Sequence, residues 1–282
     1  DGEKMRIIKV PVEDGVLTGY LRDTQEFEKE RLRPAVVICP GGSYAECSGR
    51  EGEPYALRFL TMGYQAFVLD YSVAPVRFPA ALLELARAVA LVREKADQWQ
   101  IDPEQIFVCG SSAGGHLAGS LGVHWDKKFV QEGSGRSGEK IRPDGLILCY
   151  PVITAGEYAH EGSVKNLLGE RREDRELLDL ISLEKQAGSQ VPPTFLWHTA
   201  GDRTVGAANS LLFAMALKRA GVAVELHLFS GGRHAMALGD EDTALDPEGE
   251  YADPGVAEWT RLAGLWVKRL RKNGGQAGIS RA

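Results

Sequence analysis

Short runs rich in β-branched residues alternate with helical patterns along most of the chain, and this alternation restricts the possible folds most strongly. Strands that alternate with helices build a mostly parallel sheet covered on both faces. The first two strands, 5–12 and 16–22, have the pattern of an edge hairpin. The sequence therefore predicts an α/β fold with a mostly parallel eight-stranded sheet and helices on both faces. The other six predicted strands cover residues 35–39, 64–70, 105–109, 146–150, 194–199 and 222–229.

The chain length fits one domain of this class. With 282 residues, of which 44% are hydrophobic, the chain buries a large core, and α/β folds of this size are often single domains. About 40 residues separate the sixth and seventh predicted strands, a typical place for a small lid. We predict a single domain over residues 1–282 with a lid or insertion at approximately 152–191.

Charge and cysteine usage exclude several functional classes. The chain has 33 Lys and Arg, 39 Asp and Glu and a net charge of −6, without a basic run, so no nucleic-acid partner is predicted. Charged residues interrupt every long apolar stretch, and the polar opening residues 1–4 do not resemble a signal peptide, so no membrane association is predicted. The cysteines fit buried thiols and a reducing, cytoplasmic setting better than disulfides. They are Cys39, Cys47, Cys109 and Cys149.

The pentapeptide Gly110-Ser111-Ser112-Ala113-Gly114 has the pattern GxSxG and lies between a predicted strand and a predicted helix. Strand, sharp turn and helix form the context in which this pattern presents a serine for nucleophilic attack. The small residues around the serine permit the tight turn that keeps its hydroxyl clear. We therefore predict Ser112 as a nucleophile, although an isolated match is equally compatible with a plain tight turn.

Ser112 requires a base, because a serine hydroxyl is a poor nucleophile at neutral pH. With such an elbow the chain order is Ser, then Asp or Glu, then His, which leaves His227 and His234 of the six histidines. His227 lies inside the last predicted strand, whereas His234 follows that strand on a loop at the carboxyl edge of the sheet. We predict His234 as the base. Asp202, directly after the strand 194–199, is the acid predicted to orient it, with capping of the helix near Val205 as its alternative role.

Backbone N–H groups are expected to hold the negative charge that develops on a substrate carbonyl oxygen. The residue after the nucleophile, Ala113, is predicted to supply one donor. The loop Pro40-Gly41-Gly42-Ser43-Tyr44 follows the third strand and is predicted to supply the other, from Gly42 or Ser43. Pro40-Gly41-Gly42 alone is also the sequence of an ordinary turn. No metal or organic cofactor is required by this set, and the acidic stretch 240–253 lacks the spacing of a calcium loop.

On these residues the chain resembles the α/β-hydrolase superfamily, in particular its acetyl-xylan and feruloyl esterase-like branch, which is related to the hormone-sensitive lipase group. The resemblance covers nearly the whole chain and rests on the loop at 40–44, on Phe78-Pro79-Ala80-Ala81, on the elbow 112–115 and on the Asp202 and His234 loops. Three positions depart from the pattern of the branch. Ser43 replaces a frequent glycine, Gly206 a frequent proline and Ala235 a glycine that often follows the histidine.

The resemblance implies a serine carboxylesterase that hydrolyses esters of small acyl groups through an acyl-enzyme, including acetyl esters on plant oligosaccharides. Its partner is then a small-molecule ester. A peptidase or amidase of the same fold is the alternative within the enzymes, because the same three residues also serve amides. A binding protein that keeps the fold without catalysis is the alternative from another class. The sequence leaves the oligomeric state open.

Overall fold

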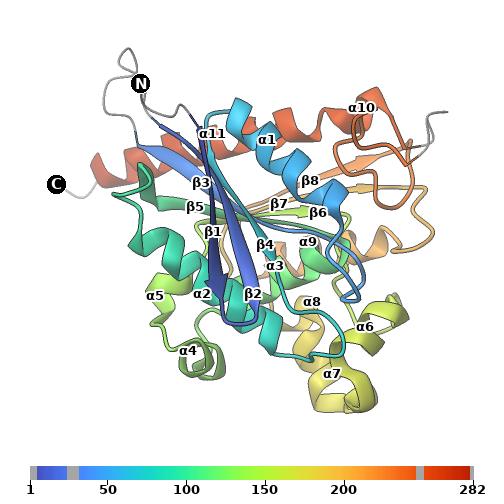
Figure 1. The fold of residues 1–282 in the computed structure, drawn as a ribbon. Helices are drawn as coiled ribbons and strands as arrows, with labels where there is room; N and C mark the ends of the chain where they lie inside the picture. Colours follow the sequence, from blue (N-terminus) through green and yellow to red (C-terminus); the bar gives the residue numbers. More distant parts are fainter. Residues whose placement is uncertain (1–4, 24–31, 246–250, 280–282) are drawn as a thin grey trace.

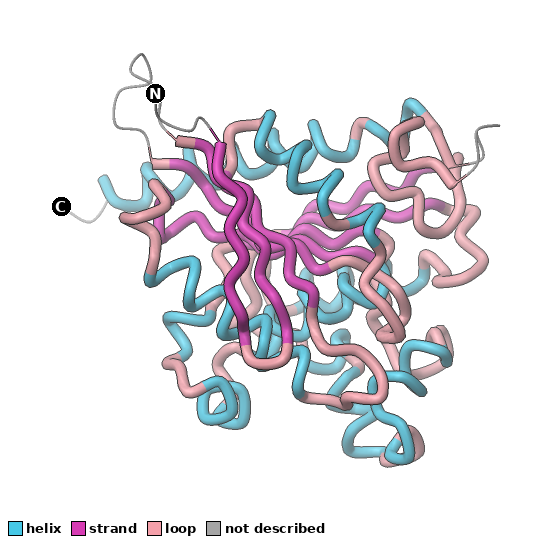
Figure 2. The backbone as a smooth tube through the Cα atoms, in the orientation of Figure 1, coloured by secondary structure: helices cyan, strands magenta, loops and turns pink. Residues whose placement is uncertain are grey.

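Alternating side chains of the central strands pack into two hydrophobic layers, one on each face of an eight-stranded sheet. Figures 1 and 2 show this sheet at the centre of the molecule with helices around it. The computed structural model describes residues 5–23, 32–245 and 251–279. Across the sheet the strands follow the order β1-β2-β4-β3-β5-β6-β7-β8. The pairs β1–β2 and β2–β4 are antiparallel, and the other neighbours are parallel. The strands are β1 (Met5–Val12), β2 (Gly15–Arg22), β3 (Arg33–Cys39), β4 (Gln65–Asp70), β5 (Ile101–Ser111), β6 (Gly145–Cys149), β7 (Thr194–Thr199) and β8 (Val224–Phe229).

Helices connect the strands and cover both faces of the sheet (Figure 1). The α-helices are α1 (Glu53–Thr61), α2 (Ala80–Glu94), α3 (Ser112–His124), α4 (Lys128–Ser134), α5 (Gly138–Ile141), α6 (Glu161–Leu168), α7 (Arg175–Ile181), α8 (Leu183–Gln186), α9 (Ala208–Arg219), α10 (Pro254–Ala257) and α11 (Trp259–Ile279). Two short 3₁₀ helices, η1 (Gly49–Glu51) and η2 (Gly169–Arg171), complete the described elements. Within the described ranges, no helix combines the length and the apolar character needed to cross a membrane.

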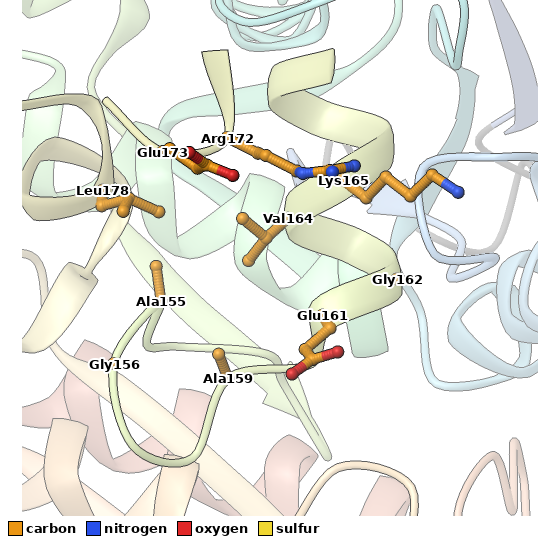
Figure 3. Close-up of a pocket in the computed structure, with 10 residues that line it drawn as sticks. All are labelled: Ala155, Gly156, Ala159, Glu161, Gly162, Val164, Lys165, Arg172, Glu173 and Leu178. Carbon is orange, nitrogen blue, oxygen red and sulfur yellow. The ribbon is translucent and has the colours of Figure 1, made fainter. Parts of the chain in front are cut away.

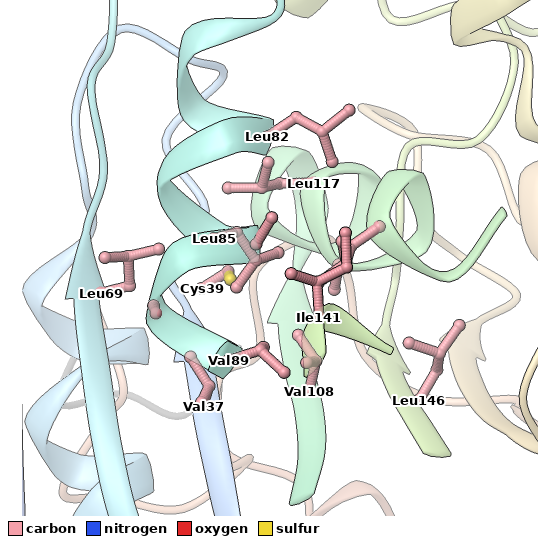
Figure 4. Packing of buried hydrophobic residues seen from close by; sticks show 14 of the residues in the cluster. Val37, Cys39, Leu69, Leu82, Leu85, Val89, Val108, Leu117, Ile141 and Leu146 are labelled. Atoms are coloured by element: carbon pink, nitrogen blue, oxygen red, sulfur yellow. The ribbon is translucent and has the colours of Figure 1, made fainter. Parts of the chain in front are cut away.

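The period of two along each strand divides the core between the faces. In β3, Val37 and Cys39 face the layer built by α2, α3 and α9, and Figure 4 shows this packing around Leu85 and Leu117. The intervening Ile38 faces the opposite layer, where α1 and α11 contribute aromatic side chains such as Trp259. Because both faces are covered, the central strands can be buried along their length, and all seven residues of β3 are buried.

The predicted fold class is confirmed, because all eight strands occur where the patterns placed them and the sheet is mostly parallel. In three places the structure differs from what the local sequence favours. The glycine-rich sequence at 133–138 is typical of a flexible loop, but it contains the end of α4, a left-handed Gly135 and the start of α5. The amphipathic pattern that follows Pro79 favours a helix as far as Trp99, but α2 ends at Glu94 and the chain continues as turns.

The third place is the C-terminal helix, for which the sequence favours one helix from about Val256 to Arg271 with a cationic end. The structure divides it into α10 and α11, and α11 continues to Ile279. Arg269 therefore lies inside the helix, where it forms an ion pair with Glu225 of β8. In the acidic stretch 240–253, Asp240 pairs with Arg58 and Asp253 caps α10, while residues 246–250 lie outside the described residues, as do residues 1–4.

The segment between β6 and β7 contains α6, η2, α7 and α8, and these helices lie together at the end of the molecule that is drawn yellow in Figure 1. Its limits agree with the insertion predicted at 152–191. A gating role for this insertion and the single-domain organisation stay predictions.

The start of α3 packs so closely on the end of β3 that only glycine fits at Gly114. A Cβ there would lie 2.0 Å from the carbonyl oxygen of Cys39 and 2.3 Å from that of Pro40. Both atoms are backbone, so the strand or the helix has to shift to admit a methyl group.

Gly114→Ala is therefore expected to lower the free energy of unfolding by about 1–3 kcal/mol, the usual cost of overpacking. Urea denaturation followed by circular dichroism measures this change. Gly206→Ala is the matched control, because a Cβ at Gly206 meets no atom within 4 Å. Equal stabilities of the two variants would contradict the close packing.

Candidate active site

The turn between β5 and α3 holds Ser112 in a strained backbone conformation. Its φ is +52°, in the left-handed region that costs a non-glycine residue about 1–3 kcal/mol. The turn is stabilised by close backbone packing, since a Cβ at Gly110 would lie 2.1 Å from the carbonyl oxygen of Gly114. Ser112 is 6% exposed, and its Oγ lies 2.9 Å from Nε2 of His234.

The predicted nucleophile, acid and base, here called the triad, lie together because β5, β7 and β8 are parallel and end at the same edge of the sheet. Ser112, Asp202 and His234 each follow one of these strands. Nδ1 of His234 lies 2.6 Å from Oδ2 of Asp202. A carboxylate accepts, so Nδ1 donates and Nε2 is left to accept the hydroxyl proton of Ser112. Thr199 at the end of β7 steadies the histidine loop by donating from Oγ1 to the Arg233 carbonyl oxygen at 3.0 Å.

Asp202 uses its two oxygens for different purposes. Oδ1 accepts the backbone N–H groups of Thr204 and Val205 at 2.9 and 2.8 Å. Oδ2 faces His234 and lies 3.3 Å from Nε2 of His198. Burial opposes ionisation of Asp202, but the hydrogen bonds from His198, His234 and the Val205 N–H outweigh it and hold its pKa well below the ordinary 3.8. The alternative role, capping of a helix near Val205, is not what the structure shows, because α9 begins at Ala208. Oδ1 instead stabilises the turn at Thr204 and Val205, while Oδ2 faces His234.

The loop after β3 lies against the elbow, as its sequence predicted. A Cβ at Gly41 would lie only 3.1 Å from Cβ of Ser112. The N–H of Gly41 donates to Oε2 of Glu51, so this amide is already used, whereas Gly42 and Ser43 follow with left-handed φ values of +127° and +56°. Asn166 of α6 donates from Nδ2 to the Ser43 carbonyl oxygen at 2.9 Å and ties the loop to the insertion.

Ser43 and Ala235, two of the three departures from the pattern of the branch, share an unusual backbone conformation. Both residues have left-handed backbones, with φ of +56° and +58°, where glycine is the easiest residue to place. In this chain serine and alanine adopt left-handed conformations, which costs local strain at both positions.

Two of the other histidines lie outside this arrangement. His227 is inside β8 and bonds Glu225, and His160 bonds Ser163 at the start of α6. Sequence reasoning set His198 aside because it precedes Asp202 in the chain. The structure places the His198 ring beside Oδ2 of Asp202. His198 lies near the end of β7, four residues before the acid, and this position is the signal that would have indicated the contact.

His116, one helical turn after Ser112, links three parts of the site. Its Nε2 donates to the carbonyl oxygen of Ile181 at 2.8 Å, which leaves Nδ1 to accept the hydroxyl of Tyr44 at 2.8 Å. Tyr44 belongs to the loop after β3, and Ile181 ends α7 of the insertion. A neutral, buried His116 therefore holds the loop, the elbow helix and the insertion together.

Two open pockets lie near this edge of the sheet. A pocket of about 490 Å³ includes His234 and is lined by Arg203, Thr204, Arg233 and Tyr251. A second pocket of about 640 Å³, shown in Figure 3, lies within the insertion and is lined by Ala155, Val164 and Leu178 with charged residues around them. The second contains none of the three triad side chains, so the pocket at His234 is the better candidate for substrate.

The buried histidines make stability depend on pH. Burial lowers the pKa of His116 from 6.5 to about 4, against the opposing effect of its bond to Ile181, and burial likewise lowers the pKa of His124 to about 4. The unfolded chain binds more protons than the folded chain between these values. Folding free energy is therefore lost as pH falls from 6.5 towards 4, at about 1.4 kcal/mol per pH unit for each histidine.

His116→Gln removes one titrating ring while keeping a polar side chain. We expect a shallower decline of the free energy of unfolding between about pH 6.5 and about pH 4, measured by urea denaturation across that range. A variant whose stability declines as steeply as that of the unmodified protein would show that His116 does not carry the effect.

Comparison with known proteins finds a matching family model and relatives that include a protein named as an esterase. Residues 24–217 match the model of the BD-FAE family. The chain is 39% identical over 217 residues to endo-1,4-beta-xylanase B of Butyrivibrio fibrisolvens, covering 74% of this chain and 33% of the relative. It is 29% identical over 210 residues to the acetylxylan esterase of Xylanibacter ruminicola, covering 73% of this chain and 41% of that protein. The chain therefore spans less than half the length of either relative.

A solved structure agrees in fold and in family. The acetyl ester-xyloside bifunctional hydrolase from Caldicellulosiruptor lactoaceticus is 42% identical, with a TM-score of 0.77, and the match covers 91% of this chain and 88% of that one. These findings confirm the resemblance that the elbow, the loop after β3 and the Asp202 and His234 loops indicated. The chain belongs to the BD-FAE family and has the α/β-hydrolase fold.

Proposed function

We propose that this chain is a serine carboxylesterase in which Ser112, His234 and Asp202 form the catalytic triad. The observation that carries the proposal is the continuous line of contacts from Ser112 Oγ to His234 Nε2 at 2.9 Å and from His234 Nδ1 to Asp202 Oδ2 at 2.6 Å. A nucleophile, a base and an orienting carboxylate in this geometry suit acyl transfer. The esterase names of the relatives support the same chemistry.

In the proposed reaction, Oγ of Ser112 attacks the ester carbonyl carbon while Nε2 of His234 accepts the hydroxyl proton. The carbonyl oxygen becomes an oxyanion, held by the N–H of Ala113 and by that of Gly42 or Ser43. Collapse breaks the ester bond, and the leaving alcohol takes the proton from His234. Water then attacks the acyl-enzyme in the same way, releasing the carboxylic acid and restoring Ser112.

The preference proposed for small acyl groups rests on the relatives. One relative acts on acetylxylan by name, and another is named for acetyl esters and xylosides.

The leaving alcohol is proposed to occupy the pocket at His234, because His234 must deliver a proton to it. Arg203, Thr204 and Tyr251 line this pocket with hydrogen-bonding groups. A hydroxyl-rich alcohol such as a sugar fits these groups, which agrees with an acetylated oligosaccharide as the substrate. The cytoplasmic location also belongs to the proposal, supported by the four unpaired cysteine thiols.

Ser112→Ala is expected to lower kcat for p-nitrophenyl acetate by roughly a millionfold, as loss of the nucleophile does in other triad enzymes. Hydrolysis by the purified variant, followed by release of nitrophenolate, measures the loss. Ser120→Ala, a buried serine further along α3, is the control that keeps activity. Undiminished hydrolysis by Ser112→Ala would refute the assignment.

A panel of p-nitrophenyl esters of increasing acyl length tests the acyl preference. We expect kcat/KM to be highest for acetate and to fall sharply for longer chains, because the relatives are named for acetyl esters. Acetylated xylo-oligosaccharides, assayed by acetate release, test the alcohol in the same series. Rates that rise with acyl length would contradict the small-acyl preference.

A further inference from the structure

Glu51 is a buried carboxylate beside the candidate site that the proposed reaction does not use. It ends η1, it is 2% exposed, and both of its oxygens accept hydrogen bonds. Oε2 accepts the N–H of Gly41 at 2.7 Å, and Oε1 accepts the hydroxyl of Tyr150 at 2.6 Å. A buried carboxylate is costly to place in a protein, so two direct contacts with parts of the site call for a functional explanation.

The first contact orients the loop that is proposed to bind the oxyanion. Because Gly41 N–H is held by Glu51, the peptide groups that follow are fixed at the end of β3. The elbow is immediately adjacent, since a Cβ at Gly41 would meet Ser112 Cβ at 3.1 Å. A shift of the Glu51 carboxylate would therefore move the amides of Gly42 and Ser43 relative to the nucleophile.

The second contact reaches the histidine loop through Tyr150. The hydroxyl of Tyr150 accepts the N–H of Ala237 at 3.1 Å, and its ring packs edge-on against the ring of His234 at 5.3 Å between centroids. Tyr150 has a φ of +37°, so its backbone is held in a strained conformation directly after β6. Behind it, Tyr55 bonds both Tyr150 and Ser111, which leads the network back to the elbow.

Arg50, the residue before Glu51, holds the same histidine loop from the other side. Its Nε donates to the Thr243 carbonyl oxygen at 2.6 Å and its Nη2 to that of Ala235 at 3.2 Å. Ala235 follows His234 directly. Two consecutive residues of η1 thus contact both the loop that carries the proposed oxyanion donors and the loop that carries the proposed base.

We propose that Glu51 is a positioning residue, which sets the place of the oxyanion donors relative to Ser112 and His234 by binding Gly41 N–H and Tyr150 OH. This inference rests on the proposed function. Transition-state stabilisation depends on donor position within a fraction of an ångström, so loss of the carboxylate should act on kcat more than on substrate binding. Glutamine keeps one acceptor oxygen for Gly41, whereas leucine keeps neither.

Glu51→Leu is expected to lower kcat for p-nitrophenyl acetate about 100-fold, comparable to loss of one oxyanion donor, with KM within about threefold. Glu51→Gln should lose only about tenfold, because one acceptor remains. The inhibition constant of phenylboronic acid, which forms a tetrahedral adduct with serine, should rise by the factor by which kcat/KM falls. Glu53→Gln and Glu53→Leu are the matched controls, since Glu53 is an exposed carboxylate two residues further on.

Circular dichroism first shows whether each variant is folded. A folded Glu51→Leu with kcat within about threefold of the unmodified protein, or with its loss confined to KM, would overturn the positioning role. If Glu51→Leu does not fold, Glu51→Gln and Tyr150→Phe decide, since the latter keeps the ring against His234 and removes the hydroxyl. Unchanged kcat in both would overturn the inference.

A fluorophosphonate probe separates this inference from the proposed function. Absence of ester hydrolysis by the unmodified protein would overturn the function alone. The rate at which the probe labels Ser112 still tests Glu51, because labelling requires the same oxyanion donors and no ester substrate. Slower labelling of the Glu51 variants than of the Glu53 variants supports positioning, and equal rates overturn it.

Discussion

The close approach of α3 to the end of β3 is the contact on which the rest of the candidate site depends. It leaves no space for a side chain at Gly114 and brings the loop at Gly41 against Ser112. The strained φ of Ser112 persists because the surrounding backbone permits no other path. One crossing of two backbones therefore places both the serine and the loop that faces it, before any side chain of the site contributes.

Two buried carboxylates near this contact, Asp202 and Glu51, are hydrogen-bonded in a similar way. One oxygen of each accepts from backbone N–H in a loop. The other oxygen accepts from a ring nitrogen of His234 in the case of Asp202, and from the hydroxyl of Tyr150 in the case of Glu51. Full hydrogen bonding offsets the cost of burying these groups and makes the loops rigid. The difference lies in their neighbours, because only the histidine is in contact with the nucleophile.

The sequence predicted those features that depend on local pattern. Strand positions follow from apolar runs, and the order of Ser112, Asp202 and His234 at strand ends follows from parallel connections. Features that depend on contacts between residues far apart in the chain could not be predicted from local sequence patterns. Glu51 meets Tyr150 across 99 residues of chain, and no motif indicates that pairing. The short helices around Gly135 have weak local patterns, and their packing against α2 determines them.

The position of His234 after β8 has a consequence for how the molecule forms. Among the described residues, β8 is the last strand along the chain, and it lies at the edge of the sheet beside β7. During synthesis the chain emerges from its N-terminus, so the elbow is made well before the histidine loop. The contacts between them join distant parts of the chain and close late in folding. A nascent chain therefore carries Ser112 before the loop of His234 exists, and the proposed triad can assemble only after β8 has been made.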